Sequence, residues 1–331
     1  MRAFGITLTM LLGVGSAHAQ AVADRLSFFE EARSREIGGA TVSLQSLVDA
    51  GLRIGEKGRT EGPLFRTRSL ATVERQFDNA VTGFAFGELR TSFGVDVDDK
   101  RIYNRETDWT GGAGVSGVWG KVSGGRVTQA VEFLTDRRPG VGNASLRDER
   151  TGVEIDQLGG AYELRMGHAR FGVAVDRHGR FDVGVVTQRP LGAVDRRFTL
   201  RITDGRFVVG KDDHGRAQAV AVGAGTTYGP VFADVEAGVE RLRGPILRAD
   251  RPFVEAGIGM KRGPWAFSAE GRYARTNRTR EMAWALGARL DLARGLSVNF
   301  GYNGTLTDGT IRGVALARKK REALFSMRYE Y

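Results

Sequence analysis

The chain contains no cysteine, and this absence limits the chemistry open to it. Without thiols it has neither a disulfide framework nor a metal site built on thiolates. A chain without thiols is also compatible with an oxidising compartment, because nothing in it needs protection there. Its 331 residues are enough for one large domain or two ordinary ones, so other signals must decide the organisation.

Long apolar runs are lacking as well. After the N-terminal segment, no apolar run reaches the roughly 20 residues that a transmembrane helix needs. The mean hydropathy is slightly negative, at −0.27, although 41% of the residues are hydrophobic. A membrane β-barrel has this kind of composition, because half of each strand faces a polar lumen.

Positive charge is present in excess. The formal net charge is +10 and the isoelectric point is near 10.2, with arginine supplying most of the positive charge. Three interpretations stay open: a general use of arginine in loops, attraction to lipopolysaccharide phosphates, and a lumen that favours anions. Nucleic-acid binding would also suit a basic protein, but the export signal described next argues against it, and no nucleic-acid partner is expected.

The N-terminus has the pattern of a secretory signal peptide. Arg2 is followed by an apolar stretch over residues 6–14 and by the small-residue site Ala17-His18-Ala19. Residues 1–19 are therefore predicted to be removed, and the mature chain to start at Gln20. Residues 20–40 are predicted to form a short periplasmic or lumenal segment, with a helix over 23–37 that is stopped by two glycines.

From residue 41 to residue 331 the chain breaks into segments in which apolar and polar residues alternate. A two-residue period places alternate side chains on opposite faces of a strand. Many segments are longer than the usual 5–6 residues of strands in soluble sheets, and match membrane strands of roughly ten residues with some overhang. The sixteen predicted strands are 41–54, 64–77, 82–97, 109–121, 126–135, 153–166, 170–176, 181–188, 196–210, 217–228, 231–241, 253–261, 264–275, 280–292, 295–304 and 311–331.

The connections between these segments alternate in length, which is a second signal. One set is short, with a seven-residue exception at 190–196. The other set is generally longer and charged, with residues 55–63, 98–108, 136–152, 211–216 and 242–252, and with a tight exception at 177–180. Short periplasmic turns and long outer loops are typical of outer-membrane barrels. Fourteen or twelve strands remain alternatives to sixteen.

The last nine residues, A-L-F-S-M-R-Y-E-Y, carry the most specific resemblance. Ala323, Phe325, Met327, Tyr329 and Tyr331 share one face, and the chain ends on an aromatic residue. This resembles the C-terminal signal of Gram-negative outer-membrane β-barrels, which the barrel-assembly machinery recognises. The resemblance implies an all-β fold, a single transmembrane antiparallel barrel in the outer membrane, with Phe325, Tyr329 and Tyr331 as the assembly signal.

The alternation assigns roles to further side chains. Trp265, Trp284 and Tyr302 are expected in the aromatic girdles that face the lipid and the lipopolysaccharide. The charged residues expected to face the lumen are Asp234, Glu236, Glu240, Glu255, Glu270, Arg272, Arg289 and Arg328. Such a mixture would either neutralise a structural lumen or create a transverse field that orients polar solutes.

The connection at 136–152 is the longest and most charged. In sixteen-stranded porins, the loop at this place in the topology folds inward and narrows the pore; the similarity here is one of position only. Either a constriction or a surface loop is compatible with the sequence. The charged residues of the predicted constriction loop are Arg137, Arg138, Arg147, Asp148, Glu149 and Arg150.

Signals of catalysis are weak. His168, His178 and His214 all fall in predicted turns, where solvated histidines are ordinary. No H-x-S-N-G string of an outer-membrane lipid hydrolase and no nucleotide- or zinc-type spacing occurs. The sequence therefore predicts a protein that is not an enzyme and needs no cofactor or metal.

The function that fits best is an outer-membrane channel for polar solutes or for an exported polymer such as a polysaccharide. Two alternatives stay open. One is a secretion translocator, since the run that begins at Val186, V-T-Q-R-P-L, is similar to some autotransporter barrels, which usually have twelve strands. The other is a structural or surface-binding barrel with a filled lumen.

Overall fold

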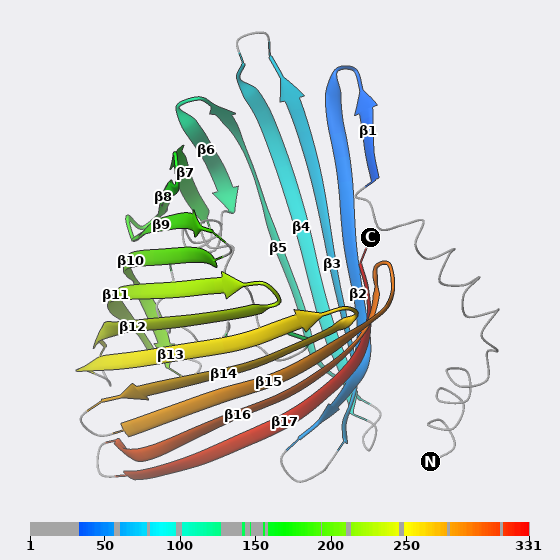
Figure 1. Cartoon of the computed structure of the whole chain (residues 1–331). Helices are drawn as coiled ribbons and strands as arrows, with labels where there is room; N and C mark the ends of the chain where they lie inside the picture. Colours follow the sequence, from blue (N-terminus) through cyan, green and yellow to red (C-terminus); the bar gives the residue numbers. More distant parts are fainter. Residues whose placement is uncertain are drawn as a thin grey trace, which may run out of the picture.

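A computed structural model describes residues 33–330, except 56–59, 78–79, 97–100, 127–140, 143–145, 147–154, 156–157, 193, 210–212, 245–247, 277–278 and 312–313. These residues form a single antiparallel sheet of seventeen strands (Figure 1). Within them, no helix is long and apolar enough to cross a membrane.

Sixteen of the strands form a sheet that closes into a barrel. Each strand from β2 to β17 pairs with its neighbour in the sequence, and β17 also pairs with β2, with Tyr329 opposite Val48. A closed barrel pairs its backbone groups within the sheet and leaves no open edge along the seam. The all-β barrel of sixteen strands that the alternation predicts is thereby confirmed.

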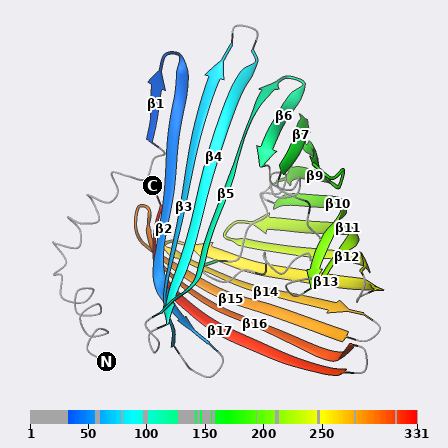
Figure 2. The same cartoon turned by 180° about the vertical axis from the view of Figure 1, so that it is seen from behind.

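The strands of one half of the barrel are β1 (Arg33–Ile37), β2 (Ala40–Ile54), β3 (Thr60–Gln76), β4 (Thr82–Asp96), β5 (Arg101–Gly117), β6 (Gly120–Arg126), β7 (Leu158–Met166), β8 (Ala169–Asp176) and β9 (Phe181–Leu191). Those of the other half are β10 (Val194–Val209), β11 (Asp213–Tyr228), β12 (Val231–Arg243), β13 (Arg248–Arg262), β14 (Trp265–Arg275), β15 (Thr279–Ala293), β16 (Leu296–Ile311) and β17 (Val314–Glu330). In projection β2–β5 run at a steep angle to β13–β17, as tilted strands on different sides of a barrel do (Figures 1 and 2).

Strand β1 is a correction to the predicted N-terminal helix. Residues 33–37 are extended and pair antiparallel with β2, with Ile37 opposite Ala40. The two glycines at 38 and 39 have positive φ angles and make a hairpin turn rather than a helix stop. Residues 20–32 and the predicted signal peptide lie outside the described residues.

The turn between β5 and β6 is also placed differently from the prediction. It falls at Val118 and Trp119, not at residues 122–125, so β6 begins six positions before the predicted 126. Gly120 follows the turn with a φ of 115°, and the hydroxyl of Tyr162 donates a hydrogen bond to the carbonyl of Trp119. Two apolar residues do not resemble a turn in the sequence, which is why alternation alone misplaced it.

The lengths of the connections differ from the prediction as well. The seven-residue exception at 190–196 is wrong, because β9 runs to Leu191 through Pro190 and β10 starts at Val194. Several predicted long loops are shorter, since β3, β5, β11 and β13 extend into them. The connection from β6 to β7, residues 127–157, is by far the longest. The connections that follow β1, β3, β5, β7, β9, β11, β13 and β15 lie at one end of the barrel, called here the short-turn end, where Glu330 also lies beside Gly295.

Candidate functional site

The barrel interior is the candidate functional site. Along β12 the side chains alternate: Val235 and Val239 are exposed on the outer face, whereas Asp234, Glu236 and Glu240 lie on the inner face. The same alternation holds on β14, with Phe267 outside and Arg272 inside. The structure places all of the charged residues predicted for the lumen on the inner face: Asp234, Glu236, Glu240, Glu255, Glu270, Arg272, Arg289 and Arg328.

The aromatic residues predicted for the girdles lie on the outer face. Trp265 stacks on Phe267 with ring centroids 6.0 Å apart. The ring of Trp284 lies over Gly304 of the neighbouring strand, which has no side chain there to displace it. Phe325 is exposed on the outside, on the same face of β17 as Tyr329, and Tyr331 lies outside the described residues. Their roles in girdles and in assembly remain predictions.

A buried ion-pair network occupies the inner face of β12–β15. Glu240 has no solvent-exposed surface and accepts hydrogen bonds from Arg251 Nε at 2.6 Å and from Arg272 Nη2 at 3.1 Å. Arg251 Nη1 also donates to Glu281 Oε2 at 2.9 Å, and the Arg272 guanidinium stands 4.9 Å from the centre of the Phe253 ring. Opposite charges that lack water need such partners, so the network holds four neighbouring strands together.

The same inner face receives the long connection between β6 and β7. The backbone N–H of Leu146 donates to Glu270 Oε2 at 2.9 Å, and that of Val141 donates to Ser268 Oγ at 2.7 Å. Leu146 is 2% exposed and packs against the inward-facing Ala285 of β15. These described residues of the connection therefore lie inside the barrel and not on its outer surface.

A second part of the connection contacts another region of the wall. Ile155 is 5% exposed and packs against Ala174 of β8 and Ala161 of β7. Leu146 and Ile155 are nine positions apart in the sequence, yet β8 and β15 lie seven places apart in the closed sheet. The connection thus touches two different sides of the interior. The six charged residues predicted to form a constriction lie outside the described residues: Arg137, Arg138, Arg147, Asp148, Glu149 and Arg150.

Sequence reasoning missed the surfaces on which this connection packs. Each is a patch of small residues at inward positions, where a barrel filled with water would need polar ones. On β15 and β16 the patch comprises Ala283, Ala285, Gly287 and Gly301, and on β7 and β8 it comprises Ala161, Gly172 and Ala174. Small apolar residues on the lumen side of a predicted strand are the signal that could have located them.

Basic residues gather on the inner face of β2–β4 and β17, called here the arginine wall. Its residues are Arg53, Arg66, Arg68, Arg90 and Arg328, with the carboxylates Asp49, Glu88 and Glu322 among them. Arg68 Nε lies 2.6 Å from Glu88 Oε1, and Arg90 is hydrogen-bonded to the same oxygen. Two guanidinium groups thus share one carboxylate, and their side chains are 51% and 49% exposed.

The seam of the barrel carries part of this wall. Arg328 Nη2 of β17 lies 3.1 Å from Asp49 Oδ2 of β2, and Arg53 lies 3.5 Å from Glu322. Arg66 has all four of these groups as charged neighbours. The first and last strands of the closed sheet are therefore tied by charge as well as by backbone hydrogen bonds.

The two histidines whose side chains the structure describes do not form a cluster. His178 lies in the turn between β8 and β9, where its backbone N–H donates to Asp176 Oδ1 at 2.8 Å. His168 is exposed in the turn between β7 and β8, and the side chain of His214 lies outside the described part. Among the described residues, no group of three or more histidine, aspartate or glutamate side chains is arranged to hold a metal ion. The absence of catalysis stays a prediction.

No family model and no curated protein sequence matches this chain. Solved structures do resemble it. OmpT of Vibrio cholerae, expressed in the outer membrane, superposes with a TM-score of 0.65 at 13% identity over 90% of this chain and 100% of that one. A porin refined at 1.8 Å gives 0.58 at 14%, and an anion-selective porin from Comamonas acidovorans gives 0.57 at 12%, each over 88% of this chain and 100% of its own. Identities this low show the fold alone, which is that of Gram-negative outer-membrane β-barrels.

Proposed function

We propose that this chain, which has the sixteen-stranded fold of the outer-membrane porins, forms a channel for polar solutes that favours anions. The observation that carries the proposal is the exposure of the lumenal charges. The side chains of Arg68 and Arg90 are about half exposed in the interior, whereas Glu240, Glu255 and Glu270 of the facing wall are buried. Between these two parts of the wall, a permeating ion therefore meets more exposed positive than negative charge from these residues.

The buried carboxylates count little in this balance because they are paired, and a charge neutralised by its partners adds little to the field in the lumen. Glu240 is neutralised by Arg251 and Arg272, and Glu270 accepts a backbone N–H from Leu146. The two half-exposed arginines have a single carboxylate between them. Rings of exposed basic groups are a recognised basis of anion selectivity in pores.

The inward connection supplies the second element of the proposal. A sixteen-stranded barrel encloses an aqueous lumen unless something fills it. Leu146 and Ile155 occupy two sides of the interior and so reduce its width. A narrowed pore brings a solute closer to the arginine wall, where the interaction between charges is stronger.

The test is single-channel conductance of the refolded protein in a planar bilayer under a salt gradient. We expect stable steps and a reversal potential that indicates anion preference. The double variant R68E/R90E reverses both exposed charges and should shift the reversal potential toward cations. Arg241→Glu is the matched control, because Arg241 lies on the outer face and its side chain is 58% exposed. A folded barrel that conducts no ions would contradict the channel proposal.

The same experiment addresses the other candidate functions. The apolar packing of Leu146 and Ile155 inside the barrel favours a structural barrel with a filled lumen as the second candidate. A folded protein without conductance would support it, or would point to an export gate that opens with a partner. The sixteen strands do not favour an autotransporter translocator, since such barrels usually have twelve.

The remaining expectations about the surroundings of the protein are part of this proposal. The fold supports residence in the outer membrane of a Gram-negative bacterium, reached by the predicted signal peptide. Outer-membrane lipid, lipopolysaccharide and the barrel-assembly machinery are the proposed partners. The transported solute is polar, and an exported polymer such as a polysaccharide stays within the proposal.

A further inference from the structure

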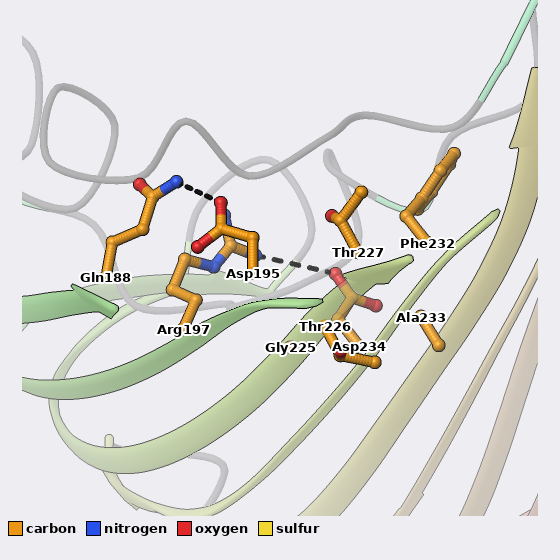
Figure 3. Close-up of a pocket in the computed structure, with 9 residues that line it drawn as sticks. All are labelled: Gln188, Asp195, Arg197, Gly225, Thr226, Thr227, Phe232, Ala233 and Asp234. Carbon is orange, nitrogen blue, oxygen red and sulfur yellow. Dashed lines mark hydrogen bonds and ion pairs between the residues drawn. The ribbon is translucent and has the colours of Figure 1, made fainter. Parts of the chain in front are cut away.

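A hollow of about 270 Å³ lies on the inner wall near the short-turn end of β9–β12. Four strands contribute polar side chains to it, and one contributes an aromatic ring (Figure 3). The residues that matter for binding are Gln188, Asp195, Arg197, Thr227, Phe232 and Asp234. Neither the ion-pair network of β12–β15 nor the arginine wall includes any of them.

The charged groups of the hollow are close together. Arg197 Nη2 stands 3.9 Å from Asp234 Oδ2, beyond hydrogen-bond distance for these two atoms. Their side chains are 17% and 12% exposed, so both are largely shielded but still reach the cavity. The amide of Gln188 donates to Asp195 Oδ2, as the dashed line in Figure 3 shows. The Asp234 carboxylate is an acceptor and the Arg197 guanidinium is a donor, and at 3.9 Å they are close enough for each to bind a hydroxyl group of the same small molecule.

Phe232 adds an apolar surface beside these groups. Its ring lies against Gly259 of β13, where a side chain in place of the glycine would collide with it. The ring is thereby supported at the edge of the hollow, next to Thr227 (Figure 3). An aromatic ring beside convergent polar groups suits a ligand that has hydroxyl groups and a face of C–H bonds.

The size and charge of the hollow narrow the ligand class. Its volume lies just below the roughly 300–1,000 Å³ of pockets for drug-sized ligands, so it fits one small molecule. The hollow contains two carboxylates, Asp195 and Asp234, and one guanidinium group, Arg197. This excess of negative charge disfavours an anionic ligand. We propose that the hollow is a binding site for a neutral, polyhydroxylated solute of monosaccharide size. This inference rests on the proposed channel function, because the solute reaches the hollow through the lumen.

Binding is tested by equilibrium dialysis of the full chain, folded in detergent, against radiolabelled methyl α-D-glucopyranoside. We expect saturable binding, competed by other monosaccharides and not by glycine. Asp234→Asn should weaken it about tenfold, since it removes a charged hydrogen-bond acceptor. Phe232→Leu should weaken it about fivefold, since it removes the ring and keeps apolar volume.

Two controls repeat these substitutions outside the hollow. Asp204→Asn lies on β10 near its other end, where Asp204 pairs with Arg216. Phe198→Leu lies on the same strand, on the outer face. Both should bind the sugar as the unmodified chain does. Equal binding by all four variants, or binding of glycine in preference to the sugar, would overturn the inference.

Conductance in plain salt separates this inference from the channel proposal. A barrel that conducts but binds no sugar would leave the channel in place and refute the binding site. A barrel that binds the sugar with the expected variant effects but does not conduct would refute only the channel.

Discussion

At the scale of single residues, burial inside the lumen separates charges that hold the wall together from charges that meet solvent. Arg272 illustrates the difference. Alternation alone makes it a lumenal charge, but its side chain is only 5% exposed, between Glu240 and the ring of Phe253. Arg68 and Arg90, which the sequence gives no reason to prefer, have side chains that are about half exposed in the interior. Selectivity is therefore expected to respond to Arg68 and Arg90, and stability to the Glu240 network.

Replacing Glu240 by glutamine should destabilise the barrel. The change removes the charge that neutralises Arg251 and Arg272, and leaves two buried guanidinium groups without it. Breaking a buried pair in this way costs about 3–5 kcal/mol, whereas an exposed pair contributes about 0–1 kcal/mol. Denaturant unfolding of the refolded protein in lipid vesicles measures the difference.

The control for this variant is Asp250→Asn. Asp250 pairs with Arg241 and Arg243 at the surface, and its side chain is 54% exposed. The free energy of unfolding of the Asp250→Asn variant should stay within about 1 kcal/mol of that of the unmodified chain. Equal losses in the two variants would show that the network on β12–β15 stabilises the barrel no more than a surface ion pair does.

At the scale of elements, the connection between β6 and β7 depends on a matching inner surface. Gly142 has a φ of 66°, and a Cβ there would stand 2.5 Å from the carbonyl oxygen of Ala288 and 2.6 Å from that of Phe300. Only a residue without a side chain lets the backbone approach β15 and β16 this closely. The inward glycine pair formed by Gly287 and Gly301 lies at the same place on the wall.

Gly142→Ala should therefore displace this part of the connection from the wall. In the proposed channel this part of the connection narrows the pore, so its displacement should change the single-channel conductance by about twofold or more, since conductance follows pore width. Gly167→Ala is the matched control, because Gly167 also has a positive φ but has open space where its Cβ would lie. Identical conductance in the two variants would mean that the contact at Gly142 does not shape the pore.

At the scale of the whole molecule, closure of the sheet is the event on which the fold depends. The seam joins the first and last strands of the barrel, since β17 pairs with β2 across 269 to 283 positions of sequence. Gly51 faces inward at this seam opposite Ser326, and a Cβ there would collide with the backbone of Phe325 and Ser326. The close approach of the two strands requires a glycine at this position.

Gly51→Val should impair closure and lower the yield of folded barrel. Folded barrels migrate differently on gels before and after heating, so the folded fraction can be read directly. Gly87→Val is the control, because Gly87 lies on β4 with no atom within 4 Å of the position of its Cβ. Similar folded fractions for the two variants would argue against a steric requirement at the seam.

The sequence alone determined the architecture of the described part. The two-residue period identified sixteen strands, and their order round the barrel followed from pairing each with its neighbour, as β12 with β13. Alternation also placed Arg289 inside and Trp265 outside, because the period of a strand leaves no other assignment once one face is known. Alternation failed to predict two features. Val118 and Trp119 form a turn although neither is a typical turn residue, and residues 33–37 are extended because they pair with β2.

The tertiary structure decided what the interior contains. Whether a lumenal charge meets solvent depends on what packs over it, and Glu270 is covered by a residue 124 positions away, Leu146. The hollow at Asp234 likewise forms from four neighbouring strands, whose side chains converge only when those strands pair. The alternation of a strand fixes the direction of each side chain, but contacts across the lumen depend on curvature, register and the path of a long connection. These are properties of the closed barrel, and no single strand encodes them.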